Sequence, residues 1–281
     1  MAKISVIGIA GNSIFMNVDH FHKKGETLNA LSVCEEIGGK GFNQAVACAK
    51  MGAEVSFLCA VGEDIFAEQC KQTAKEHGIN AKFITKANKR TAFAVILTDK
   101  SGENKVTAYK DAELCGADVD LFEEEIANSD ILLLQHEVPN EVNQAAVSIA
   151  KKYGVRVILN PAPVRSISDT LANEVFAVTP NEQEKEAIDI SRFKNCITTL
   201  GSKGCSINGE TFIDAINVKV RDTTGAGDTF NGVLAVCLAN GMDITSACKY
   251  AVTASGLSVE KNGVLNAIPT KEEIERKINN E

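Results

Sequence analysis

The sequence predicts an α/β protein with a mostly parallel central sheet. Apolar runs of strand length alternate with amphipathic helical segments along most of the 281 residues, which is the pattern of repeated β-α-β units. Polar residues follow several of these runs, for example Gln135, His136 and Glu137 after 131–134 and Asn160 after 157–159. Because parallel strands present their carboxyl ends at one edge of a sheet, these positions predict a ligand site at that edge.

Composition narrows the class of protein. The hydrophobic share of 44% and the charged share of 23% are ordinary for a soluble globular protein. A net charge of -8 argues against a general nucleic-acid binder, and no apolar run approaches the roughly 20 residues of a membrane span. The first apolar run lacks a basic leader and a cleavage site, and the nine cysteines include no Cys-x-x-Cys pair. We therefore expect a cytoplasmic protein with free thiols and with no nucleic-acid or membrane partner.

A glycine-rich turn leads into the helix predicted for residues 40–51. Gly38, Gly39 and Gly41 would let the backbone approach a ligand, and Lys40 and Asn43 would present hydrogen-bond donors to it. The phosphate-binding pattern GxxxxGK[ST] is absent, since Lys40 is followed by glycine. A purely structural turn is the alternative interpretation.

Two stretches predict strands outside the regular repeat. Residues 31–34 alternate without a helical stripe, and residues 90–110 form two apolar runs around a Ser-Gly-Glu-Asn turn. The second stretch is either part of a small separate sheet or an ordinary hairpin in the main sheet. Residues 54–78, 142–160 and 244–259 continue the alternation of strands and helices.

A second polar cluster stands at the end of the strand before residue 181. Asn181 could donate to phosphate oxygens, and Glu184 could hold Mg²⁺ through water, because magnesium keeps several waters and uses few protein ligands. A solvent-exposed glutamate in the first turn of a helix is the alternative. A strand, a glycine turn and another strand follow at 196–207, after a short interval.

The stretch DTTGAGDTFNG at 222–232 is the most specific segment of the chain. It places three glycines at the start of a predicted helix, with one carboxylate, Asp228, inside the loop. The free amides of a first helical turn suit a phosphate or a developing oxyanion, and Asp228 beside them suits a base that removes a hydroxyl proton. A glycine turn with Asp228 as the N-cap is the alternative.

Four motifs occur in one order: GGKG, TPNE, TLG and TGAGD. In this order they resemble the ribokinase-like (phosphofructokinase-B) family of sugar and nucleoside kinases. The resemblance implies a three-layer α/β/α sandwich with a mostly parallel central sheet. Compared with the family, the interval between Glu184 and Cys196 is short, so we expect a helix to be trimmed there. It also implies a single kinase domain over residues 1–281, with strands of a small lid contributed by about 13–37 and 90–110, and it allows a homodimer formed through the lid.

The same resemblance implies roles for individual residues. The catalytic base is Asp228, with Gly225, Ala226 and Gly227 as the anion hole. The sugar site comprises Gly39, Lys40, Asn43, Glu137 and Asp228, together with Gly11 and Ser13, which stand where ribokinases carry asparagine and aspartate. The nucleotide site comprises Asn181, Thr199, Leu200, Gly201, Ser202, Lys203, Gly204 and Gly227. Metal ligands are Glu184 for Mg²⁺ and Asp222 and Thr224 for K⁺, with Ala267 where a serine is typical.

The expected function is ATP-dependent phosphorylation of the primary hydroxyl of a small, furanose-like sugar, with ATP and Mg²⁺ as cofactors and K⁺ dependence left open. D-ribose is expected to be a poor substrate, because Ser13 replaces the aspartate of the first strand. A nucleoside kinase on the same fold and a non-catalytic sugar- or nucleotide-binding regulatory protein are the alternatives. A Rossmann dehydrogenase is excluded because the first strand is followed by GIAGNS rather than GxGxxG.

Overall fold

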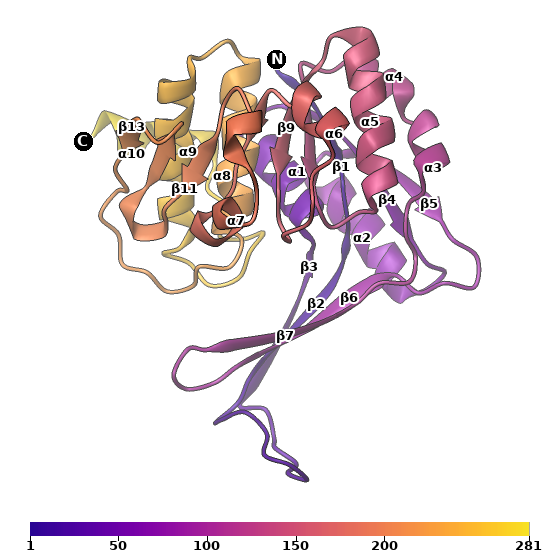
Figure 1. The fold of residues 1–281 in the computed structure, drawn as a ribbon. Helices are drawn as coiled ribbons and strands as arrows, with labels where there is room; N and C mark the ends of the chain where they lie inside the picture. The colour runs from indigo at the N-terminus through magenta and orange to yellow at the C-terminus, as the bar shows by residue number, and fades with distance from the viewer. Residues whose placement is uncertain (281) are drawn as a thin grey trace.

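A parallel six-stranded sheet with helices on both faces forms the body of the computed structural model, which describes residues 1–280 (Figure 1). The strands are β1 Lys3–Ile7, β2 Gly11–Asn17, β3 Ser32–Gly38, β4 Glu54–Val61, β5 Asn80–Thr85, β6 Ala92–Thr98, β7 Asn104–Tyr109, β8 Ile131–Gln135, β9 Arg156–Asn160, β10 Ala177–Val178, β11 Ile197–Thr199, β12 Cys205–Ile207 and β13 Thr211–Ile213. The helices are α1 Lys40–Lys50, α2 Ile65–Glu76, α3 Gly116–Asp120, α4 Glu123–Ala127, α5 Asn140–Tyr153, α6 Asp169–Glu174, α7 Glu182–Glu186, α8 Ala226–Ala239, α9 Ile244–Ser258 and α10 Lys271–Asn279, with 3₁₀ turns at Ile190–Arg192 and Gly201–Lys203.

The main sheet has the strand order β10-β9-β8-β1-β4-β5, and every pair in it is parallel. Its central strands are apolar on both sides, as parallel strands covered on both faces must be. One face is covered by α1, α2, α8 and α9, and the other by α3 to α6, each over its own buried apolar cluster. This arrangement confirms the predicted three-layer fold, and it collects the carboxyl ends of the strands at one edge.

A three-stranded antiparallel sheet, β11-β12-β13, continues the body beyond β10. Single parallel bridges from Val178 to Cys196 and from Asn181 to Thr199 join the two sheets. The interval between Glu184 and Cys196 contains only the end of α7 and one 3₁₀ turn, in agreement with the trimmed helix expected there.

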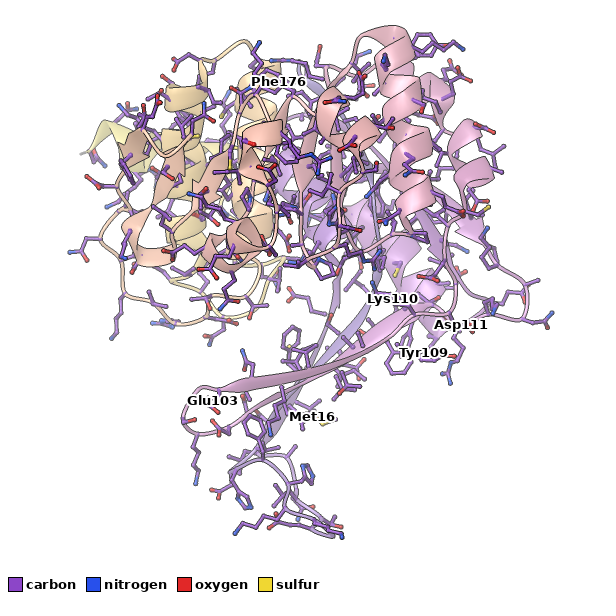
Figure 2. All side chains as sticks on the ribbon, viewed as in Figure 1. Met16, Glu103, Tyr109, Lys110, Asp111 and Phe176 are labelled. Atoms are coloured by element: carbon purple, nitrogen blue, oxygen red, sulfur yellow. The ribbon has the colours of Figure 1, made fainter. Side chains whose placement is uncertain are left out.

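Four strands form a separate sheet that projects from the body, with the order β3-β2-β6-β7; we call it the arm sheet (Figure 1). Strands β2 and β6 are parallel neighbours, while β3 and β7 pair antiparallel on the outside. Residues 90–110 therefore do not form a hairpin in the main sheet, and that alternative is wrong. Figure 2 shows Met16 and Glu103 far out on the arm sheet, and Lys110 and Asp111 where it joins the body.

The described residues also bear on membrane-spanning helices and on the state of the cysteines. Within residues 1–280, no helix combines the length and apolarity that a membrane span requires. All nine cysteines are free thiols, of which Cys34 and Cys115 are exposed and the others buried.

Candidate active site

Helix α8 begins directly after a left-handed residue, Gly225, whose φ is 75°. A Cβ built there would lie 2.5 Å from Cγ1 of Val264, so both the backbone angle and the available space favour glycine. Gly225 is the N-cap, and Asp228 lies in the first turn of the helix. The alternative in which Asp228 caps the helix is therefore wrong.

The carboxylate of Asp228 is buried, with a residue exposure of 5%, and two side-chain amides orient it. Asn43 Nδ2 donates to Asp228 Oδ2 at 2.8 Å, and Gln44 Nε2 donates to Oδ1 at 3.1 Å. Gln44 is held in turn by Gln135, whose Nε2 donates to Gln44 Oε1 at 2.6 Å. Sequence reasoning missed Gln44; the available signal was a second amide next to Asn43 on an otherwise apolar helix.

The backbone around Asp228 leaves amide groups free on the same turn. Ala226 N donates to Thr223 O at 3.3 Å, and Asn231 Nδ2 donates to Gly227 O at 2.8 Å. Among the described residues, none accepts a hydrogen bond from the amides of Gly225 and Gly227. These two amides can therefore donate to an anion beside Asp228. The amide of Ala226 could do so only after its hydrogen bond to Thr223 O is broken.

Two charged residues from other elements surround this turn on the side of the arm sheet. Glu137 Oε2 accepts from Lys40 N at 2.7 Å, and Lys110 Nζ donates to Glu137 O at 2.9 Å. The nearby Asp228 carboxylate raises the pKa of Lys40, and burial raises the pKa of Glu137. The structure thus brings Lys40, Asn43, Glu137 and Asp228 together.

Strand β2 presents Ser13 to the same region. Ser13 Oγ and Asn43 Oδ1 lie 3.0 and 3.8 Å from the position of a Cβ built on Gly38. Asn12 faces the opposite side of β2, where its Nδ2 donates to Glu35 Oε2 at 3.1 Å. At Gly11 a Cβ would overlap the carbonyl oxygen of Ala92, so only glycine fits this backbone.

A second cluster lies where the main sheet meets β11. Asn181 caps α7, its Oδ1 accepting from Glu184 N at 2.7 Å, and Glu184 Oε2 accepts from Asn181 N at 2.8 Å. This capping box occupies one oxygen of each side chain. Thr199 N donates to Pro180 O at 2.9 Å, so the turn over 199–204 lies beside Asn181. Leu200 N closes that turn on Gly204 O at 2.8 Å.

Comparison with known proteins agrees with this geometry. The model of the pfkB family carbohydrate kinases matches residues 1–271. The chain belongs to the pfkB family of carbohydrate kinases. A ribokinase from Lactococcus lactis is 36% identical over 99% of this chain and 97% of its own length. The structure of a ribokinase from Thermotoga maritima superposes with a TM-score of 0.91 at 32% identity, covering 99% of this chain and 100% of the other. An Arabidopsis thaliana ribokinase complexed with ribose and ATP gives a TM-score of 0.86 at 27% identity, covering 98% of each chain.

In this pfkB kinase a third group of contacts supports the turn that precedes α8. Asp222 Oδ1 accepts from Thr224 N at 2.9 Å, and Asp222 Oδ2 accepts from Gly263 N at 3.3 Å. Asp222 and Thr224, expected at a cation site, are therefore adjacent. Among residues 1–280, no cluster of three or more His, Cys, Asp or Glu side chains is arranged to hold a metal ion.

Proposed function

We propose that this pfkB kinase transfers the γ-phosphoryl group of ATP to the primary hydroxyl of a small, furanose-like sugar, with Asp228 as the general base. The observation that carries the proposal is the buried Asp228 carboxylate, oriented by Asn43 and Gln44 on the turn that carries the free amides of Gly225 and Gly227. A base must be held within reach of the hydroxyl proton while an anion-binding turn lies beside it.

The transfer then follows from the positions of these groups. Asp228 accepts the proton of the sugar hydroxyl as that oxygen bonds to the γ-phosphorus, and the bond from phosphorus to the bridging oxygen of ADP breaks. The amides of Gly225 and Gly227, and that of Ala226 once released from Thr223, donate to the transferring phosphoryl oxygens. Lys40 and Glu137 lie on the sugar side, where a primary hydroxyl is directed toward Asp228. Positioning of this kind accounts for most of the acceleration in phosphoryl transfer.

The nucleotide is assigned to the turn over 199–204 and to Asn181, whose side-chain nitrogen has no hydrogen-bond partner among the described residues. ATP bound as its Mg²⁺ complex supplies the phosphoryl group with part of its charge neutralised. Glu184 fits a magnesium site reached through water, because one of its oxygens is outside the capping box. Asp222 and Thr224 are the residues that would hold K⁺ near the turn that precedes α8.

We further propose that residues 1–281 act as one kinase unit in which the arm sheet is a lid over the sugar. Support comes from Ser13, which lies on the arm sheet and faces Asn43. The arm sheet also exposes Leu31, Val33 and Val106 by 62%, 63% and 63%, which fits a homodimer formed through the two arms. The free thiols fit the reducing cytoplasm.

The experiment that tests the function is an ATP-consumption assay on a panel of pentoses, hexoses and nucleosides, with the product analysed by ³¹P NMR. We expect a sugar phosphorylated at its primary hydroxyl. Nucleosides leading the panel would favour a nucleoside kinase, and sugar binding without turnover would favour a regulatory protein. Slower amide exchange in 28–33 and 90–110 on sugar binding would support the lid, and protection confined to the main sheet would contradict it.

A further inference from the structure

Glu36, on strand β3 of the arm sheet, makes a bidentate hydrogen-bond contact with a loop more than 220 residues later in the chain. Its Oε2 accepts from Val264 N and its Oε1 accepts from Leu265 N, both at 2.7 Å. The two amides are consecutive, so one carboxylate satisfies both donors of a tight turn. Glu36 is half-buried, whereas its neighbour Glu35 is exposed on the opposite side of the strand, in contact with Asn12.

The loop that Glu36 holds, residues 261–268, is in direct contact with residues 222–227 at the start of α8. We call these residues the phosphate-binding turn, because the proposed function places the transferring phosphoryl group beside them. Cγ1 of Val264 lies 2.5 Å from the position of a Cβ on Gly225, the N-cap of α8. Gly263 N donates to Asp222, which also accepts from Thr224 N. On its other side the loop is fixed by Lys50 Nζ, which donates to the carbonyl oxygens of Leu265 and Ile268 at 2.7 and 2.8 Å.

Glu36 is also connected to the proposed sugar side of the site. It is paired with Ser13 across β2 and β3, and it stands two residues before Gly38, where the chain leaves the arm sheet for α1. Strand β3 therefore contacts the 261–268 loop through Glu36 and, a few residues later, leads into α1, which contains Lys40 and Asn43.

We propose that Glu36 is a positioning residue that couples the arm sheet to the phosphate-binding turn of α8, so that the sugar hydroxyl and the anion-binding amides are aligned together. This inference rests on the proposed function. In this proposal Glu36 acts through its two hydrogen bonds to the 261–268 loop and not through a substrate, so its loss should affect alignment in the transition state more than binding. A carboxylate is required because both donors are amides: a glutamine has one acceptor and turns an NH₂ group toward the second N–H.

The test compares Glu36→Gln and Val264→Ala with Glu35→Gln, a matched change on the same strand that faces away from the loop. Steady-state kinetics and hydrogen exchange are measured at a temperature where circular dichroism shows every variant folded. For Glu36→Gln we expect kcat to fall about 10- to 100-fold, the scale of a lost charged hydrogen bond, with KM for sugar and ATP within about twofold. Peptides over 261–268 and 222–229 should both exchange faster. Val264→Ala should reproduce both effects more weakly, and Glu35→Gln neither.

Three results would overturn the coupling. One is an unchanged kcat in Glu36→Gln. Another is a rise in KM for sugar with kcat intact, since Glu36 would then belong to sugar binding alone. The third is faster exchange confined to 261–268, which would make the contact structural only. If the wild-type protein phosphorylates no alcohol, the proposed function fails, but the exchange of 222–229 in Glu36→Gln and Val264→Ala still decides the coupling.

Discussion

Asn43 and Asp228 are 185 positions apart in the chain, yet the side-chain amide of one donates to the carboxylate of the other at 2.8 Å. Helices α1 and α8 make this possible, because both cover the same face of the main sheet and begin at its ligand-binding edge. The first turn of one helix thus orients the base on the first turn of the other. Catalysis is therefore expected to depend on α1 as well as on Asp228 itself.

Asp228→Asn should reduce kcat/KM by about 10²–10⁴-fold, the usual contribution of a general base, while nucleotide binding persists. An asparagine at position 228 keeps one acceptor oxygen, so its NH₂ group would face the donor of either Asn43 or Gln44, and we expect a stability loss of about 1–3 kcal/mol. Activity assays and urea unfolding measure the two effects. Asp120→Asn, at an exposed position, is the control, and near wild-type turnover of Asp228→Asn would disprove the base assignment.

Gln44→Glu tests the second amide that orients Asp228. It replaces the donor at 3.1 Å with a second carboxylate, and like charges at that distance disfavour ionisation of the pair. The acid limb of the pH profile of kcat/KM should therefore move to higher pH, with activity recovering at alkaline pH. Gln72→Glu, on the exposed face of α2, is the control, and an unshifted profile for Gln44→Glu would show that Gln44 does not act on the base.

Some features of this site could be predicted from the sequence because they depend on local chemistry. The turn at 225–227 and the polar residue Glu137 after β8 are marked by glycine content and by position at a strand end. The orientation of Ser13 and Asn12 was harder to predict, since a shift of one residue in register exchanges the two faces of a strand. Glu36 and Gln44 were missed because their partners lie 228 and 184 residues away, and only tertiary packing brings such pairs together.

His136 should make the protein sensitive to acid. Burial lowers its pKa to about 4, with the Arg165 charge as a smaller cause, against 6.5 in the unfolded chain. A histidine whose folded pKa is depressed contributes stability that is present above pH 6.5 and is lost as pH falls toward 4. The loss should reach about 3 kcal/mol below that window. Urea unfolding of the wild type and His136→Gln from pH 7.5 to 4 measures the difference in slope.

His22→Gln provides the control for that experiment, because His22 is exposed on the loop at the end of the arm sheet. Its stability should follow the wild-type pH dependence, whereas that of His136→Gln should be flatter between pH 6.5 and 4. Identical slopes for the wild type and His136→Gln would contradict the assignment.

Ser13 should set the preference among sugars. Its hydroxyl faces the space above Gly38 that Asn43 also borders, at the position where the resemblance to ribokinases places an aspartate. A hydrogen bond to a charged group contributes about 1.5–3 kcal/mol, so the wild type should use D-ribose with a kcat/KM roughly 10- to 150-fold below what a carboxylate at position 13 would allow. Ser13→Asp should recover that factor for ribose, and another sugar or a nucleoside should lead the wild-type panel.

The matched control is Asn12→Asp, which adds the same charge one residue away on the other face of β2, beside Glu35. It should give no gain with ribose, because the new carboxylate is directed away from Asn43. The comparison of kcat/KM across the panel thus separates a general effect of negative charge on the arm sheet from a specific contact at position 13. If D-ribose has by a wide margin the highest kcat/KM of the wild-type panel, and Ser13→Asp does not raise that value, then Ser13 does not determine the sugar preference.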